Sequence, residues 1–189
     1  GNLAIGNITL NGGVLKIGKT TGSQTFVLDN STNLTLPADS EIYFNSGSIL
    51  NYSGAEVSLG KILTLGGSGQ LQNTNDLNLG AGGKLKLSEI SVAKVITSAD
   101  SLGLKIDNDT TITSLSVNNL IPVSIASGKT LSGAVTVTGG SIKLDETGTL
   151  ASNISMSGGT LDADESLTVS GTVTQAGNAT IDVASGKTL

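Results

Sequence analysis

Apolar and polar residues alternate over short stretches of the chain, and Gly, Asn, Asp and Ser separate these stretches. In Ile142-Lys-Leu144 and Ile154-Ser-Met156 every second residue is apolar, and Gly158-Gly159 follow. Alternation with a period of two, ended by turn-forming residues, predicts short β-strands joined by tight turns. No stretch has the apolar spacing, with start and stop signals, that a helix requires. The pattern therefore predicts an all-β protein.

The alternating stretches recur along the chain. The heptapeptide Ile125-Ala-Ser-Gly-Lys-Thr-Leu131 returns as Val183-Ala-Ser-Gly-Lys-Thr-Leu189, and alternating tripeptides divide the interval between the two copies. Across the whole chain these tripeptides begin at residues 15, 26, 42, 63, 85, 104, 123, 142, 161 and 181. A period of about 19 residues with two or three short strands predicts a parallel β-solenoid, whose turns stack about 4.8 Å apart.

The spacing of the tripeptides also predicts how the chain is organised. We expect about ten turns, or rungs, in one continuous domain, with irregular turns in residues 1–84 and regular 19-residue turns in 85–189. The sequence opens already in pattern, and it stops at Leu189 where the earlier copy runs on past Leu131. Because open solenoid ends are unpaired edges, we expect further turns of a longer chain, or other copies end to end, to cover them.

The composition removes several kinds of chemistry. The chain has no His, Cys or Trp, and all ten of its basic residues are Lys, so that Arg is absent too. Without imidazole or thiol groups there is no Ser-His-Asp or Cys-His catalysis, no disulfide and no zinc knuckle. Aromatic residues make up 2 % of the chain, as suits a thin coil lined by aliphatic side chains. We therefore expect a scaffold without cofactors, and not an enzyme.

The net charge and the hydropathy of the chain limit the kinds of partner that we expect. The net charge is −5, and no cluster of basic residues is present that could neutralise phosphates, so we expect no nucleic acid partner. No apolar run approaches the roughly 20 residues that a membrane span needs, so we expect no span.

One segment resembles a known group of repeats. It reads Gly158-Gly-Thr-Leu-Asp-Ala-Asp-Glu-Ser-Leu-Thr-Val-Ser-Gly-Thr-Val-Thr-Gln-Ala-Gly177 and is similar to the repeats of bacterial autotransporter passengers and filamentous-haemagglutinin-type adhesins. The resemblance covers most of the chain from Leu85 on. It implies a right-handed β-helix in a secreted protein on the bacterial cell surface, with a structural or adhesive role. The implied partners are further copies in a filament, and a glycan or a host or cell surface.

Equal positions of successive turns stack in a solenoid, and one of them holds threonine repeatedly: Thr111, Thr130, Thr149, Thr168 and Thr188. Threonine suits an exposed strand face, and like side chains stack favourably. Alternatively, the array of hydroxyl and methyl groups binds a periodic carbohydrate or ice surface, similar to the threonine arrays of some β-solenoid antifreeze proteins. A second polar column is expected at Thr136, Ser155 and Thr174, but neighbouring Thr-x-Thr pairs fall in different columns, so we expect no wide threonine face.

Carboxylates offer the remaining candidate chemistry. Asp145 and Asp164 share a column one turn apart, and calcium binds six to eight oxygen atoms. The Gly-Gly-x-Gly-x-Asp repeat of calcium-binding solenoids does not occur, so we expect no metal site. Paired carboxylates also serve glycoside hydrolysis, which leaves a polysaccharide-active enzyme as a third alternative. Lys143 above Asp162 predicts an ion pair between turns, worth a few tenths of a kcal/mol.

Overall fold

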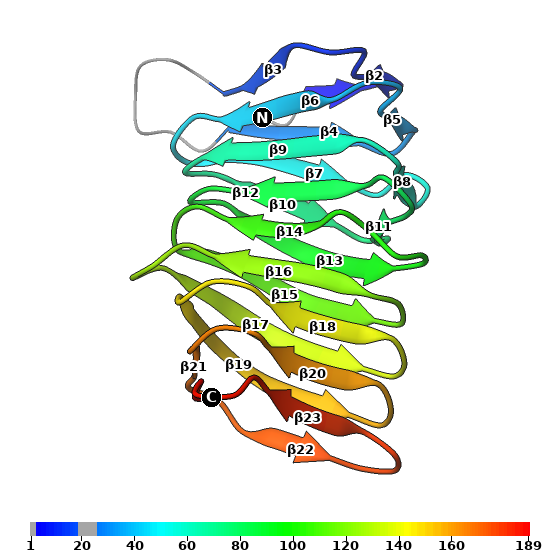
Figure 1. Cartoon of the computed structure of the whole chain (residues 1–189). Helices are drawn as coiled ribbons and strands as arrows, with labels where there is room; N and C mark the ends of the chain where they lie inside the picture. The colour runs from blue at the N-terminus through cyan, green and yellow to red at the C-terminus, as the bar shows by residue number, and fades with distance from the viewer. Residues whose placement is uncertain (1–2, 19–25) are drawn as a thin grey trace.

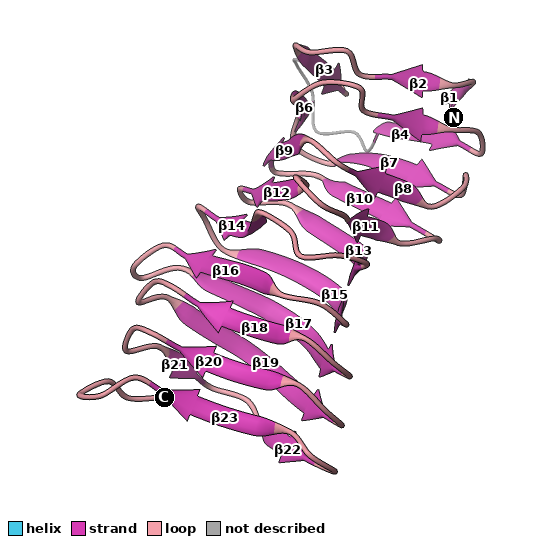
Figure 2. Cartoon of the chain, turned by 45° about the vertical axis from the view of Figure 1, so that its right-hand side comes forward, coloured by secondary structure: helices cyan, strands magenta, loops and turns pink. Residues whose placement is uncertain are grey.

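The computed structural model describes residues 3–18 and 26–189, and its regular elements are all β-strands (Figure 1 and Figure 2). Successive passes of the chain stack from the N-terminal end of the molecule to the C-terminal end, and adjacent strands pair in parallel. The predicted all-β parallel β-solenoid is therefore confirmed. Within the described residues no helix is long and apolar enough to cross a membrane.

The first part of the coil has three short strands in each turn. These strands are β1 (Leu3–Ile5), β2 (Ile8–Thr9), β3 (Val14–Ile17), β4 (Phe26–Asn30), β5 (Leu34–Thr35), β6 (Ser40–Phe44), β7 (Ser48–Tyr52), β8 (Val57–Leu59), β9 (Ile62–Gly67), β10 (Gln70–Asn73), β11 (Leu77–Leu79) and β12 (Lys84–Leu87). We call the turns from β1 to β12 the wide turns.

From β13 onwards each turn has one long strand and one short strand, and only the last long strand is split in two. The elements are β13 (Ser91–Thr97), β14 (Gly103–Ile106), β15 (Thr110–Val117), β16 (Ile121–Ile125), β17 (Thr130–Val137), β18 (Ser141–Leu144), β19 (Thr149–Met156), β20 (Thr160–Ala163), β21 (Thr168–Val169), β22 (Val173–Gln175) and β23 (Thr180–Val183). We call these the narrow turns.

The turns number about eight, and the expectation of ten was too high. One nine-stranded sheet runs β23-β20-β18-β16-β14-β12-β9-β6-β3, and its nine strands enclose eight intervals. The tripeptide at Phe26, which we expected to begin a turn of this sheet, belongs to β4 in the other sheet and pairs with β7. In the wide turns, strands of both sheets alternate in the same way, so that alternation alone assigns Phe26 to the wrong sheet.

The turns shorten along the chain. Near the N-terminal end, the Thr35 hydroxyl donates a hydrogen bond to Thr9, one turn away and 26 residues earlier in the sequence. Near the C-terminal end, the Thr172 N–H donates to the Asn153 side chain, likewise one turn away but only 19 residues earlier. The strand pairs of both sheets follow the same trend. A turn at the C-terminal end of the coil therefore has one strand fewer and several residues fewer than a turn at the N-terminal end.

A buried asparagine lies where three strands become two. The first residues of β13 pair with β10 and its last residues with β11, which leaves the middle of β13 without a strand opposite in the preceding turn. The Asn73 side chain fills this gap: its Oδ1 accepts hydrogen bonds from the Ala93 and Lys94 N–H groups at 3.1 and 3.3 Å, and its Nδ2 donates to the Lys94 carbonyl at 2.8 Å. One side chain thus replaces missing backbone partners.

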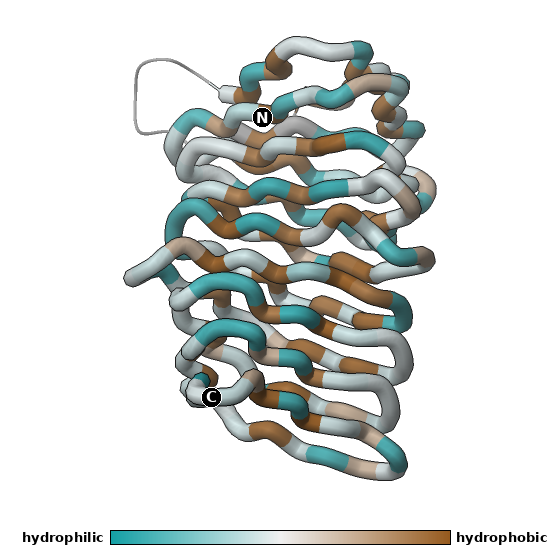
Figure 3. Tube along the Cα trace, viewed as in Figure 1, coloured by the Kyte–Doolittle hydropathy of each residue, from teal (hydrophilic) through white to brown (hydrophobic). Residues whose placement is uncertain are grey.

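The interior is a continuous column of aliphatic side chains. Figure 3 shows apolar and polar residues alternating along the strands. Leu63, Leu85 and Leu161 are fully buried, and among the described residues no Asp, Glu or Lys is buried. Phe44 points inward and Tyr43 is 39 % exposed, as the alternation of the strand predicts. The aromatic side chains are confined to the wide turns, which have the larger cross-section.

Candidate functional site

The two larger sheets, of twelve and nine strands, present different outer faces. In the narrow turns, strands β15, β17, β19, β21 and β22 contain no charged residue, and their outward side chains are mainly Ser, Thr, Ala and Asn. We call this surface the neutral face. The nine-stranded sheet carries Lys or Asp at outward positions of β12, β14, β18, β20 and β23, and we call it the charged face. From β15 onwards charge is therefore separated between the two sides of the coil, whereas β13 carries the exposed Lys94.

Only three of the five predicted threonines stack on one another. Thr130 lies opposite Thr149, and Thr149 lies opposite Thr168. Thr111 lies opposite Ser132 instead, and Thr188 lies beyond β23, where its carbonyl accepts a hydrogen bond from the Leu167 N–H. The expected column of five is thus corrected to a column of three.

The shift at Thr111 has a local cause. Thr110 follows Ile106 by four residues, but its partner Leu131 follows Ile125 by six, so that the corner before β17 is two residues longer than the corner before β15. That corner contains its own turn, in which the Lys129 N–H donates to the Ala126 carbonyl at 2.9 Å. A register irregularity between Ile112 and Ser114 then recovers one residue.

The second polar column forms as expected and is longer. Thr136, Ser155 and Thr174 lie opposite one another in successive turns, and Ser116 precedes them. Two further outward columns run beside it on the neutral face, formed by Thr111, Ser132 and Ala151 and by Ser114, Ala134 and Asn153. The neutral face is therefore several columns wide, although its residues are mixed and not a threonine array. Sequence reasoning missed this width because it followed threonine alone.

On the charged face one ion pair forms with a different partner. Lys143 lies opposite Asp162 in the strand register, as predicted, but its Nζ lies 2.8 Å from the Asp164 carboxylate. The long lysine side chain reaches two residues further along the next turn, where Asp164 follows the end of β20. A second pair joins Lys105 and Asp107 at 3.3 Å, and Lys187 pairs with Glu165.

The carboxylates around Lys143 affect one another. Burial raises the pKa of Asp145 above its ordinary value, and the nearby Asp164 charge adds to this while Lys143 opposes it. Burial and the Asp164 charge likewise raise the pKa of Asp162. The hydrogen bond and ion pair to Asp164 raise the pKa of Lys143. Lys143 thus acts as the counter-ion of an acidic cluster.

The two calcium candidates lie in this cluster. Asp145 and Asp164 follow β18 and β20, one turn apart as predicted, and Lys143 already neutralises Asp164. Across the part of the chain that the structure describes, no group of three or more acidic residues is arranged to hold a metal ion. The same two residues are the candidates for a hydrolytic carboxylate pair, and neither side chain is buried.

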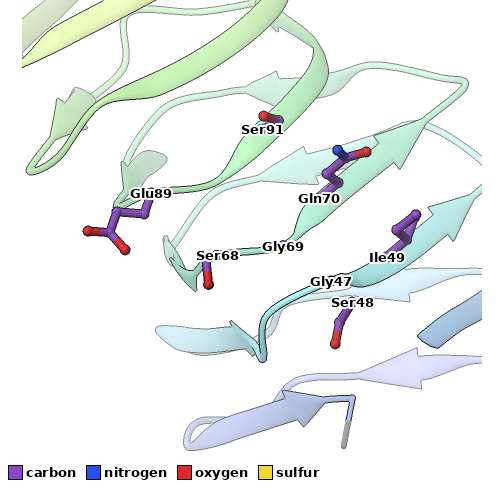
Figure 4. Close-up of a pocket in the computed structure, with 8 residues that line it drawn as sticks. All are labelled: Gly47, Ser48, Ile49, Ser68, Gly69, Gln70, Glu89 and Ser91. Carbon is purple, nitrogen blue, oxygen red and sulfur yellow. The ribbon is translucent and has the colours of Figure 1, made fainter. Parts of the chain in front are cut away.

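A shallow hollow of about 360 Å³ lies at the corner between the two larger sheets and extends from β7 of the wide turns to β13, the first strand of the narrow turns (Figure 4). It is lined by Gly47, Ser48, Ile49, Ser68, Gly69, Gln70, Glu89 and Ser91. Sequence reasoning did not find this hollow. The signal that could have pointed to it is the run Gly66-Gly-Ser-Gly69, which removes side chains from one corner of the coil.

Comparisons with known proteins return no match: neither a protein-family model, nor a curated protein, nor a solved structure matches the chain.

Proposed function

We propose that the chain is a stiff structural segment of a secreted bacterial surface or filament-forming protein. The observation that carries this proposal is the interior: buried aliphatic side chains continue through the stacked turns, and no Asp, Glu or Lys of the described residues is buried among them. Catalytic sites are where burial and charge strongly perturb ionisable groups. A core of this kind instead supports a rod, in which each turn is stabilised by the turns next to it.

The resemblance of the repeats to autotransporter passengers and filamentous-haemagglutinin-type adhesins supports the same proposal. It adds an extracellular location on the bacterial cell surface, a right-handed coil, and partners that are other copies or a host or cell surface. The chain needs no disulfide for this, because its stability is distributed over neighbouring turns.

The test begins with where the protein is found and how it depends on turn number. Antibodies against the chain should label intact cells that produce it, and added protease should remove the label. Deleting residues 142–160 removes one complete turn and brings Leu161 into the place of its partner Ile142. The shortened protein should fold, reach the surface and lose about 5 Å of length, measured by X-ray scattering of the purified chain. Label that appears only after cell lysis would contradict the proposal.

A second candidate is a binding module for a periodic carbohydrate or ice surface. The neutral face favours it, since its Ser and Thr columns repeat at the spacing of the turns, about 4.8 Å. Replacing Thr149 and Thr168 with Lys should abolish such binding and leave the fold intact, as judged by circular dichroism. The matched control places the same charges elsewhere, at Ser124 and Ser127. Binding to crystalline polysaccharide that survives Thr149→Lys/Thr168→Lys would exclude this candidate.

Hydrolysis or cleavage of polysaccharide is the third candidate. Asp145 and Asp164 are the carboxylates that the sequence offers for it, and Lys143 holds Asp164 in an ion pair. Glycan turnover by the purified chain that is lost in Asp145→Asn and Asp164→Asn would establish this activity.

A further inference from the structure

Glu89 has an unusual backbone conformation. Its φ is 57°, and it is the one residue other than glycine with positive φ among the described residues. This left-handed region is sterically unfavourable for a residue with a Cβ, and glycine adopts it at little cost. The equivalent corners of the two preceding turns use Gly47 and Gly67, with φ of 71° and 88°. Glycine would therefore suit this corner better, and the strain of Glu89 suggests that its carboxylate has another use.

Glu89 lines the corner hollow, which is a second and independent observation. The hollow follows one outward column over three turns, because Ile49 pairs with Gln70 and Gln70 pairs with Ser91. Two intervals between turns make this floor about 10 Å long. Gly69 packs closely at this corner and cannot carry a side chain: a Cβ there would lie 2.4 Å from the Ser48 carbonyl oxygen and 2.6 Å from the Phe44 Cβ. The hollow is thus built into the packing of the corner.

The lining selects a chemical class of ligand. No Lys lines the hollow, which argues against an anion, and Glu89 is its only carboxylate, too few for calcium with its six to eight oxygens. Ile49 supplies the one apolar side chain in the lining, which argues against a hydrophobic ligand. Donors and acceptors are mixed: Glu89 accepts, and the Ser68 and Ser91 hydroxyls do both. The Gln70 Oε1 already accepts from Gln72 at 2.8 Å, so its amide nitrogen is the group that can donate outward.

We propose that the corner hollow binds a hydroxyl-rich, uncharged ligand, namely a sugar ring of a glycan, with the Glu89 carboxylate accepting hydrogen bonds from its hydroxyl groups. The volume of about 360 Å³ lies near the lower end of the roughly 300–1,000 Å³ of small-molecule sites. Figure 4 shows the Glu89 side chain extending away from Ile49, Gln70 and Ser91, so the hydroxyl groups that its carboxylate accepts from would lie at that edge of the hollow. This site lies where the wide turns meet the first narrow turn, apart from the neutral face, and it does not depend on the proposed structural role.

Titration of the ¹⁵N-labelled chain tests the proposal. The probes are the methyl glycosides of glucose, galactose, mannose and N-acetylglucosamine, with methylammonium chloride and calcium chloride as separate arms. At least one glycoside should shift the amide signals of Ser68, Gly69, Gln70 and Glu89, with a dissociation constant in the millimolar range. If only methylammonium or calcium shifts these signals, the hollow is a cation site and the proposal is wrong. If no probe shifts them at tens of millimolar, the hollow binds no sugar and the proposal is likewise wrong.

Variants locate the binding. Glu89→Gln should weaken glycoside binding about tenfold or more, because hydrogen bonds to a charged acceptor are the strong ones. Ser68→Arg should fill the hollow and abolish binding, whereas Ser127→Arg, at an exposed serine in a corner of the narrow turns, should leave it unchanged. Glu89→Gly keeps the corner without strain, so it should lose binding while remaining folded. Equal binding by Glu89→Gln, Glu89→Gly and the parent chain would overturn the role of the carboxylate.

Discussion

The wide and narrow turns differ in cross-section, and they fill the interior of the coil with different side chains. The wide turns use three short strands, and they bury Phe44 and Tyr52. Their extra corner requires polar side chains inside the coil: Tyr52 donates to the Ala55 carbonyl at 2.7 Å, and Asn73 binds the middle of β13. The shorter turns from β17 onwards have a core of apolar side chains in which Ser152 is the one buried polar residue. The wide turns therefore combine buried aromatic residues with hydrogen bonds from buried side chains, and the turns from β17 onwards have neither.

Core truncation should have the largest effect and tests how well each cross-section is packed. Phe44→Ala in the wide turns should lower the free energy of unfolding by about 4 kcal/mol, and Leu144→Ala in the narrow turns by about 3 kcal/mol, since the larger side chain leaves the larger cavity. Both side chains are fully buried in the nine-stranded sheet. Urea unfolding followed by circular dichroism measures both values. A smaller loss for Phe44→Ala would show that wide turns collapse around the cavity.

Replacing Asn73, the buried asparagine where three strands per turn become two, should have the next largest effect on the free energy of unfolding. Asn73→Ala should lower the free energy of unfolding by about 2 kcal/mol, because it leaves part-buried backbone groups of Ala93 and Lys94 without their partners. Asn153→Ala is the matched control: this exposed side chain accepts one bond from the Thr172 N–H at 3.0 Å, and about 1 kcal/mol or less is expected. Hydrogen exchange should speed up at Ala93 and Lys94. Unchanged exchange there would mean that water replaces the side chain.

Alanine substitutions at corner glycines test how closely neighbouring turns stack in the two parts of the coil. A Cβ on Gly159 in the narrow turns would lie 2.5 Å from the Gly140 carbonyl oxygen, whereas a Cβ on Gly82 in the wide turns would lie 3.3 Å from the Gly60 carbonyl oxygen. Both residues have positive φ, 74° and 76°. Gly82→Ala should therefore cost about 1 kcal/mol from backbone strain, and Gly159→Ala about 2 kcal/mol with the steric clash added. Thermal unfolding measures the order, and equal losses would remove the distinction between the corners.

Substitutions in the acidic cluster around Lys143, formed by Asp145, Asp162 and Asp164, should have the smallest effect on the free energy of unfolding. Because the folded state raises the pKa of Asp162, its ionisation opposes folding, and this cost appears as the pH rises through that pKa. Asp162→Asn should therefore stabilise the protein by a few tenths of a kcal/mol at pH 7, and the gain should disappear below about pH 3, where the aspartate is protonated. Asp164→Asn should act in the opposite direction at pH 7, since it removes the ion pair with Lys143. A gain from Asp162→Asn that persists in acid would exclude the electrostatic explanation.

Much of this fold could be predicted from alternation and spacing. The tripeptides at Leu85 and Leu104, and those at Ile142 and Leu161, pair as the sequence predicts, because from β12 onwards the strands of the nine-stranded sheet follow a simple in-out pattern. Phe26 was assigned to the wrong sheet because the wide turns alternate on every strand and the period is not constant. Asn73 could not be recognised as a core residue, since asparagine between apolar stretches is typical of a turn.

The candidate surfaces were predicted less well, for reasons of register. A corner two residues longer moved Thr111 out of the threonine column, and no periodic pattern reveals the length of a corner. The ion pair of Lys143 depends on which way a long side chain extends, and strand register does not determine that. The hollow at Glu89 arises from missing side chains and one strained residue, and neither feature alters the hydropathy pattern.

The shortening of the turns has a mechanical consequence. If the chain is pulled from its ends and turns detach one at a time, each event releases the residues of one turn. At about 3.3–3.6 Å per extended residue, a 19-residue turn would add roughly 65 Å and a 26-residue turn roughly 90 Å. Turns between the ends repeat every 21 or 22 residues, so force–extension traces should show a graded series of steps, and the size of the first step would report from which end of the coil unravelling began.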